Sequence, residues 1–302
     1  MIGTVYKSTG SWYKVKLENE KFIDCRLLGK FREKNIKSTN PVCVGDVVKL
    51  NNNKNTPQIE FILERKNYLI RKSVKLSKQF HIIASNIDIC FLIITVKNPE
   101  TSTMFIDRFL ASTFSYNIDT VLLFNKVDDI SDKEENTLKT FLATYKSAGY
   151  DCLKISGKKG INIDKLKLIM KGKSCVFSGH SGVGKSTLIN RLDSKINIKT
   201  LPISKSNLSG QHTTTFSEMH DLEFGSRIID TPGIKGFGLF DVSNFELKDF
   251  FKEFISVEQC KFNNCLHYNE PGCNVKILVE NGLISRSRYD NYIQLLEEIQ
   301  NS

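Results

Sequence analysis

The sequence lacks the features that mark several common protein classes. It contains one tryptophan and six prolines, with no internal repeat and no low-complexity segment. Its longest apolar run, Ile89 to Val96, is far shorter than the ~20 residues that span a bilayer. The first ten residues, MIGTVYKSTG, contain no apolar core of the kind found in secretory signals. We therefore expect neither a secreted nor a membrane-spanning protein, and no membrane partner.

Composition and cysteine content indicate a folded protein of a reducing compartment. The chain has 302 residues, of which 40% are hydrophobic and 25% charged, which is ordinary for globular domains. A chain of this length has room for about two domains. Eight cysteines without an export signal favour a cytoplasmic location, where metal binding or catalysis is more common than disulfide formation.

The net charge of +10 comes entirely from the first quarter of the chain. Residues 1–80 contain 17 Lys and Arg against 7 Asp and Glu, whereas residues 81–302 contain 26 of each kind. A basic module on a neutral body suggests a surface for a polyanion, with nucleic acid as the leading candidate. The alternative is a lysine-rich surface that is merely solvated.

The N-terminal zone, residues 1–70, is typical of a small all-β domain. The runs GTVYK, WYKVKL, KFIDCRLL and GDVVKL are short and β-rich, which suits an OB-type barrel that binds RNA. Trp12, Tyr13, Phe22 and Phe31 are candidates for stacking on bases, although at least half of them are expected in the core. The basic stretch Arg65–Lys78 shows no clear period and is interpreted as a linker.

Residues 71–236 alternate β-rich runs with helical stretches. The predicted strands are Ile87–Val96, Thr120–Phe124, Cys152–Ile155, Ser174–Phe177 and Arg227–Ile229. The predicted helices are Met104–Phe114, Lys133–Ala148, Ile163–Met170 and Lys185–Leu192. This alternation predicts an α/β domain with a mostly parallel sheet. Residues 237–302 are predicted to be helical around a Cys/His cluster.

A phosphate-binding loop follows the predicted strand Ser174–Phe177. Its residues are Gly179, His180, Ser181, Gly182, Val183, Gly184, Lys185 and Ser186, followed by Thr187. The glycines let backbone N–H groups cradle phosphate oxygens at the positive end of a helix. Lys185 is expected to reach the β- and γ-phosphates during the reaction, and the Ser186 hydroxyl to help hold Mg²⁺.

Two further segments indicate a guanine base. Asn125, Lys126 and Asp128 follow a predicted strand, and the Asp128 carboxylate matches the N1–H and N2–H₂ donors of guanine. Adenine lacks those donors and would leave the carboxylate unpaired, at a cost of several kcal/mol. The loop of Ser156, Gly157 and Lys158 follows the next strand and is expected to pack on the base.

Two switch segments complete the predicted nucleotide site. Asp230 and Gly233 belong to the run DTPG after the strand Arg227–Ile229, where Asp230 would bind Mg²⁺ and the Gly233 N–H would sense the γ-phosphate. Thr214, in the run GQHTTT, is the candidate to close the Mg²⁺ shell. A plain strand edge is the alternative interpretation of that threonine run.

The order of these segments differs from that of an ordinary GTPase. The base-reading tetrad (125–128) and the serine loop (156–158) precede the phosphate loop (179–186) and both switches. The same sheet can still form, because domain termini often lie close together and can be rejoined. The sequence therefore predicts a circular permutation.

The C-terminal zone contains a compact set of metal ligands. Cys260, Cys265, His267 and Cys273 have the spacing C-x4-C-x-H-x5-C, which suits one structural, tetrahedral Zn²⁺. The alternative is buried free cysteines, as expected for the other five. Lys261, Arg286 and Arg288 lie nearby in the sequence and are interpreted as RNA-contacting or solvated surface residues. The metal is expected to hold this small domain together.

In combination, these motifs resemble the circularly permuted, ribosome small-subunit-dependent GTPases of the RsgA family. The resemblance covers nearly the whole chain and includes GDVV, RKNYLIR and DRFL. It implies an OB-type barrel at 1–70, a circularly permuted P-loop GTPase domain at 71–236 and a helical zinc-binding domain at 237–302. It also implies action late in assembly of the small ribosomal subunit, with rRNA, GTP and GDP as partners. We expect a monomer.

The catalytic machinery departs from that of most small GTPases. Ile234 follows Gly233 where a water-orienting glutamine usually stands, so another polar group must act. His212 is the candidate, which the resemblance supports, and the alternative is that it only packs within its loop. Gln211 stands where the family usually has arginine. Slow intrinsic turnover, accelerated by an RNA–protein partner, is the expected behaviour.

The sequence thus predicts a hydrolase that converts GTP to GDP and phosphate. Three alternatives remain open at this point. The chain could be a non-catalytic RNA-binding assembly factor with a structural nucleotide site, a permuted GTPase of the large subunit, or a phosphate-loop kinase. The intact nucleotide motifs argue against a non-catalytic factor. The basic barrel and the metal cluster argue against a large-subunit GTPase, and the guanine tetrad argues against a kinase.

Overall fold

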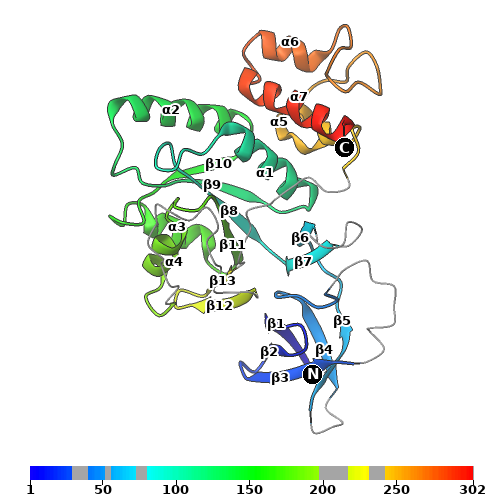
Figure 1. Cartoon of the computed structure of the whole chain (residues 1–302), viewed down its shortest axis with the longest axis vertical. Helices are drawn as coiled ribbons and strands as arrows, with labels where there is room; N and C mark the ends of the chain where they lie inside the picture. The colour runs from blue at the N-terminus through cyan, green and yellow to red at the C-terminus, as the bar shows by residue number, and fades with distance from the viewer. Residues whose placement is uncertain (29–39, 52–55, 73–79, 197–216, 231–241, 302) are drawn as a thin grey trace. The chain divides into compact units, whose positions relative to one another are not determined.

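The computed structural model describes residues 1–28, 40–51, 56–72, 80–196, 217–230 and 242–301 (Figure 1). The chain divides into two compact units. The first unit comprises Met1–Phe91, Ile163–Ser178 and Lys185–Gly236, and the second comprises Leu92–Asn162, Gly179–Gly184 and Phe237–Ser302. Among the described residues, every helix is too short or too polar to cross a membrane.

A closed five-stranded barrel forms the N-terminal part of the first unit. Its strands are β1 (Ile2–Ser8), β2 (Tyr13–Leu17), β3 (Phe22–Leu27), β4 (Val47–Asn51) and β5 (Gln58–Ile62). They pair in the order β1-β2-β3-β5-β4, and β4 returns to β1, so the sheet closes on itself. Alternate apolar side chains fill the interior. The predicted barrel is confirmed, although β5 is missing from the strands that the sequence predicts.

The aromatic side chains of the barrel divide between its core and its surface. Tyr13 is only 2% exposed and belongs to the core, whereas Trp12 and Phe22 are 40% and 45% exposed. The Arg26 guanidinium lies 4.1 Å from the Trp12 ring, and the Lys14 ammonium lies 4.9 Å from the Phe22 ring. The expectation that at least half of these aromatics are core is therefore wrong for the three that the structure describes, since only Tyr13 is core, while Phe31 lies outside the described residues.

The prediction that Arg65–Lys78 is a linker is wrong for residues 65–72, whereas residues 73–78 lie outside the described residues. Strand β6 (Tyr68–Lys72) lies within this stretch and pairs antiparallel with β7 (Phe80–Ser85). Arg65 is also fixed, because its Nε lies 2.7 Å from Oδ1 of the fully buried Asp46. Basic residues surround the short apolar run of β6, and its partner strand lies further along the chain, so no local pattern marks it as a strand.

The rest of the first unit contains a sheet that is continuous with the barrel. Its strands are β8 (Ile89–Ile94), which crosses into the second unit after Phe91, β11 (Ser174–Ser178), β13 (Ser226–Asp230) and β12 (Glu218–Leu222). β11 and β13 are parallel, β12 is antiparallel to β13, and β12 also pairs with β1 of the barrel. Helices α3 (Ile163–Met170) and α4 (Lys185–Leu192) have the predicted bounds.

The second unit combines three strands with most of the helices. β8 and β10 (Asp151–Lys154) flank β9 (Thr120–Phe124), and β9 and β10 are parallel. Helix α1 (Thr103–Ser115) begins at Ser102, whose Oγ accepts from the Phe105 N–H at 3.3 Å. Helix α2 (Asp132–Ser147) begins with a capping box. The predicted α/β alternation is confirmed.

The C-terminal helices pack around their own apolar core. They are the 3₁₀ helix η2 (Leu247–Phe250), α5 (Lys252–Ile255), α6 (Asn274–Glu280) and α7 (Arg286–Gln300). Tyr292 forms edge-to-face contacts with Phe251 and Phe254, which are stacked on one another in this core. Two of the metal-ligand candidates, Cys265 and Cys273, belong to it as well.

Candidate nucleotide site and metal centre

The phosphate loop is shaped by two glycines with backbone angles that disfavour other residues. Gly179 has φ 150°, and a Cβ there would lie 2.7 Å from the Ile93 carbonyl oxygen. Gly184 has φ 94°, and a Cβ there would lie 2.6 Å from Nδ2 of Asn125. Both separations are too short for a carbon, so the loop needs glycine at these positions. Helix α4 begins at the next residue, Lys185.

Asn125 joins the base-reading tetrad to two other loops of the second unit. Its Nδ2 donates to the Val183 carbonyl at 2.7 Å, and its Oδ1 accepts from the Gly157 N–H at 3.1 Å. The side chain is 5% exposed, so these bonds form away from water. One amide thus ties segments 125–128, 156–158 and 179–184 together.

Lys126 supports the same arrangement from the neighbouring position. Its φ of 65° is unusual for a residue with a side chain. The ammonium donates to the carbonyl of Gly182 at 2.8 Å and also to the carbonyl of Asn98. Burial lowers the pKa of this amine. Asn125 and Lys126, two residues of the tetrad, therefore both hydrogen-bond the phosphate loop.

Asp128 is held ionised beside the serine loop. A hydrogen bond from the Ser156 side chain is the largest cause that lowers the pKa of Asp128, and Lys158 lowers it further. Ser156 is fully buried, and its Oγ also accepts from the Lys159 N–H at 2.9 Å. An oriented carboxylate that carries a full charge is the acceptor that two adjacent N–H donors require.

The remaining predicted nucleotide residues are only partly described. Lys185, Ser186 and Thr187 form the first turn of α4, and Asp230 ends β13. Because β13 runs parallel to β11, Asp230 stands at the edge where β11 also ends. His212, Thr214 and Gly233 lie outside the described residues. The predicted roles of all these residues stay predictions.

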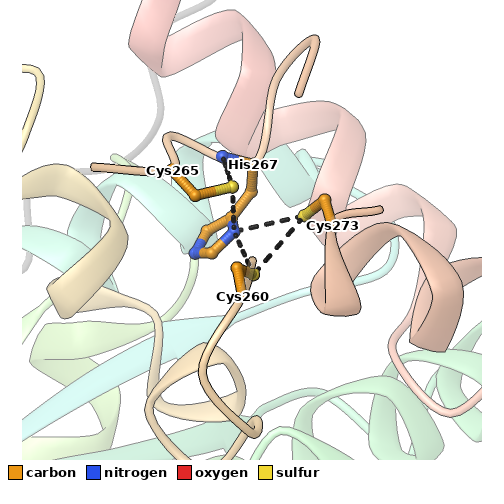
Figure 2. A group of neighbouring side chains, drawn as sticks. All are labelled: Cys260, Cys265, His267 and Cys273. Carbon is orange, nitrogen blue, oxygen red and sulfur yellow. Dashed lines mark hydrogen bonds between the residues drawn. The ribbon is translucent and has the colours of Figure 1, made fainter. Parts of the chain in front are cut away.

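Three sulfurs and one ring nitrogen meet in the second unit (Figure 2). Nδ1 of His267 lies 3.6 Å from Sγ of Cys260, 3.4 Å from that of Cys265 and 3.3 Å from that of Cys273. Zn–S bonds near 2.3 Å give a tetrahedron with edges of about 3.5–3.8 Å. The three distances from the His267 nitrogen agree with these edges, and all four ligand atoms lie within 4.8 Å of one another, so they could hold one metal ion. Burial raises the pKa of Cys265 to about 12, and a bound cation would offset the cost of ionising this thiol.

Helix α7 holds the ligand loop through two tyrosines that the sequence analysis does not single out. The Tyr289 hydroxyl donates to the His267 carbonyl at 2.8 Å, and the Tyr292 hydroxyl donates to the Leu266 carbonyl at 2.5 Å. The carboxylate of Glu270 accepts from the N–H groups of Leu266 and Tyr268. The signal in the sequence is the i,i+3 spacing of two tyrosines in one helix.

The prediction that Arg288 is a surface residue is wrong. Its side chain is 1% exposed, and its guanidinium lies 2.6 Å from both Oδ1 of Asp107 and Oε1 of Glu253. Phe251 covers it, with the ring centroid 4.8 Å from Cζ. A buried arginine needs such carboxylate partners, which come from α1 and α5, far away in the sequence. Arg286, two residues earlier, is exposed.

Comparison with known proteins settles the family. The family model for the RsgA GTPase matches residues 62–240, and that for the RsgA N-terminal domain matches residues 2–58. The chain belongs to the RsgA GTPase family. Its order of nucleotide motifs, with the guanine tetrad ahead of the phosphate loop, is the circular permutation that the sequence predicts, and the predicted fold class is confirmed.

Relatives and solved structures of this family align along nearly the whole chain. The Small ribosomal subunit biogenesis GTPase RsgA of Christiangramia forsetii is 55% identical, over 98% of this chain and 96% of that protein. The Small ribosomal subunit biogenesis GTPase RsgA of Flavobacterium johnsoniae is 52% identical, over 98% of this chain and 93% of that protein. The crystal structure of YjeQ from Thermotoga maritima superposes with a TM-score of 0.83 at 34% identity, over 100% and 99%. YloQ, described as a circularly permuted GTPase, superposes with a TM-score of 0.78 at 29% identity, over 99% and 95%.

Proposed function

We propose that this RsgA-family GTPase hydrolyses GTP to GDP and phosphate while bound to the small ribosomal subunit during its biogenesis. One observation carries the proposal. The buried Asn125 side chain hydrogen-bonds both the serine loop and the phosphate loop, and it belongs to the base-reading tetrad itself. This supports one preorganised site in which the segments expected to bind guanine and phosphates lie together.

The proposal assigns a residue to each chemical task of GTP hydrolysis. Asp128 binds the guanine edge, and Lys185 neutralises charge that develops on the phosphates. Ser186, Thr214 and Asp230 offer the oxygen ligands that Mg²⁺ prefers, and the bound ion would neutralise the phosphate oxygens. His212 would orient the attacking water, because Ile234 has no polar atom for that task.

In this proposal the N-terminal barrel binds the RNA partner, and a zinc ion stabilises the C-terminal helices. The excess positive charge of residues 1–80, together with exposed Trp12 and Phe22, suits binding of rRNA by the barrel. Zn²⁺ at Cys260, Cys265, His267 and Cys273 would be structural, because the four protein ligands leave no open position. The ion at that site crosslinks the small C-terminal core.

The deciding experiment measures phosphate release from GTP by the full chain, alone and with isolated small or large subunits, with ATP as the control nucleotide. We expect slow release alone and strong acceleration by small subunits only. His212→Ala should bind GTP normally and lose turnover. Normal GTP binding without hydrolysis under any condition would favour a non-catalytic assembly factor, and equal acceleration by both subunits would refute the proposed partner.

A further inference from the structure

The phosphate loop of the second unit is in direct contact with helix α1. The imidazole of His180, the second residue of the loop, lies on the ring of Phe105, with 3.8 Å between ring centroids and 33° between ring planes. Burial lowers the pKa of His180, so the ring is neutral at neutral pH. Phe105 lies in the first turn of α1 and also contacts the buried Phe109. A movement of the loop at His180 would therefore displace Phe105 and with it the first turn of α1.

The residues that follow Phe105 bind α1 to α7. Oδ1 of Asp107 accepts from Nη1 of Arg288 at 2.6 Å, and its Oδ2 accepts from Nδ2 of Asn291 at 2.6 Å. Arg108 adds an ion pair with Glu298, 2.6 Å between Nη2 and Oε2. The first pair is almost fully buried, so it is not weakened by water.

Apolar packing reinforces the same connection. Ala111 of α1 is part of the buried core of the C-terminal helices, and Met104 packs against that core. Further along, Tyr289 and Tyr292 of α7 hold the carbonyls of the metal-ligand loop. Contacts thus run without interruption from the phosphate loop through α1 and α7 to the ligand loop.

We propose that α1 couples the phosphate loop to the C-terminal helical domain, so that a guanine nucleotide bound at the loop stabilises α7 through the contact between His180 and Phe105. The coupling acts by loss of motion: a nucleotide that orders the loop restricts Phe105, and α1 passes the restriction to α7. This coupling rests on the proposed nucleotide binding and adds a way in which the bound nucleotide regulates the C-terminal helices. By linkage, a partner that orders α7 would in turn tighten nucleotide binding.

This coupling differs from one that acts through the switch segments. The phosphate loop surrounds the phosphates of GDP as well as GTP, whereas a switch responds to the γ-phosphate. Coupling through α1 therefore operates with GDP. GDP with Mg²⁺ is the probe that separates the two routes.

The experiment is amide hydrogen exchange of the full-length protein, with and without saturating Mg²⁺–GDP. We expect GDP to slow exchange in residues 286–300 by about fivefold, at the weak end of the couplings seen between protein sites. Binding of fluorescent GDP is titrated separately. Failure to bind GDP would refute the proposed nucleotide site, whereas binding without slower exchange in α7 would overturn the coupling alone.

Substitutions at Phe105 test the route. Phe105→Leu keeps an apolar side chain on α1 but removes the aromatic face, so GDP should bind and no longer slow exchange in α7. Phe105→Tyr keeps the ring and should behave as wild type. The matched control is Phe114→Leu, in the last turn of the same helix, where the ring lies beneath Lys252 and the slowing should persist.

A second substitution interrupts the route at its other end. Asn291→Ala removes one hydrogen bond to Asp107 and leaves the Arg288 pair in place, so it should reduce the GDP-dependent slowing in α7 without preventing folding. Undiminished slowing in both Phe105→Leu and Asn291→Ala would overturn the proposal. Slowing that occurs with a GTP analogue but not with GDP would assign the coupling to the switches instead.

Discussion

At the scale of single residues, Asp128 and Asn125 show how one tetrad divides its tasks. The Asn125 amide bonds to other parts of the protein: its Nδ2 donates to the Val183 carbonyl, and its Oδ1 accepts from the Gly157 N–H. A hydrogen bond from Ser156 lowers the pKa of the Asp128 carboxyl and keeps it ionised. We therefore expect base choice to depend on Asp128, whereas Asn125 and Lys126 hydrogen-bond the neighbouring loops.

Asp128→Asn should weaken GDP binding by at least about tenfold, because it replaces two charge-assisted acceptors with one neutral acceptor and one donor. The amide N–H₂ would face the N–H groups of guanine. Competition between GDP and ADP for a fluorescent GDP analogue measures the effect.

The matched control is Asp129→Asn, because Asp129 is the exposed neighbour in the same loop. It removes the same charge without touching the predicted base contact, so GDP affinity should be unchanged. Equal losses in the two variants would mean that the loop contributes only general electrostatic attraction.

At the scale of elements, β12 is the strand that joins barrel and GTPase sheet within the first unit. Glu218 pairs in register with Lys7 of β1 on one side and with Asp230 of β13 on the other. The Lys7 ammonium lies 2.9 Å from Oε2 of Glu218. The Tyr6 hydroxyl donates to Oδ1 of Asp221 at 2.7 Å. The barrel is thus hydrogen-bonded to the strand next to the one that ends in Asp230.

The phenol of Tyr6 makes this junction sensitive to alkaline pH. Burial, then the hydrogen bond to Asp221, raises the pKa of Tyr6 to about 12. In the unfolded chain the phenol loses its proton near pH 10. Its stabilising contribution is therefore complete below about pH 10 and is lost as the pH rises from there toward 12.

Tyr6→Phe should lower the thermal midpoint at pH 8, where the hydrogen bond contributes about 1 kcal/mol. The difference from wild type should shrink between about pH 10 and pH 12. Tyr268→Phe is the control, since that phenol donates to Glu297 at an exposed site. A difference for Tyr6→Phe that stays constant with pH would contradict the raised pKa.

At the scale of the whole molecule, we expect the C-terminal helices to depend on a bound metal more than the rest of the chain does. They contain short helices of four and seven residues around a core that includes two of the ligand cysteines. The ligand loop holds α7 through Tyr289 and Tyr292. Structural zinc contributes on the order of 10 kcal/mol in small peptides, which is comparable to the stability of a whole domain.

Removal of the metal with a strong chelator should therefore release one Zn²⁺ per chain and raise exchange rates in residues 257–300. The strands of the barrel should keep their protection, since they share no ligand with the site. Elemental analysis and hydrogen exchange provide the two measurements. Cys265→Ser should reproduce the loss, and Cys152→Ser, at a half-buried cysteine outside the cluster, should keep the metal.

Much of this molecule was predictable from local patterns. The bounds of α3, α4 and β9 agree with the sequence prediction to the residue, because apolar periodicity and a glycine-rich turn are local signals. The nucleotide motifs and the metal-ligand spacing are local as well. The permutation follows from motif order alone, and the family is confirmed by comparison.

Contacts between segments far apart in the chain could not be predicted from such local patterns. The partners of Arg288 lie 35 and 181 residues away, so nothing near it in sequence marks it as buried. The pairing of β1 with β12, 211 residues apart at the Lys7–Glu218 bond, is equally invisible to periodicity. Local sequence patterns specify the chemistry of each segment, whereas three-dimensional packing determines which segments touch, because burial and pairing depend on both partners at once.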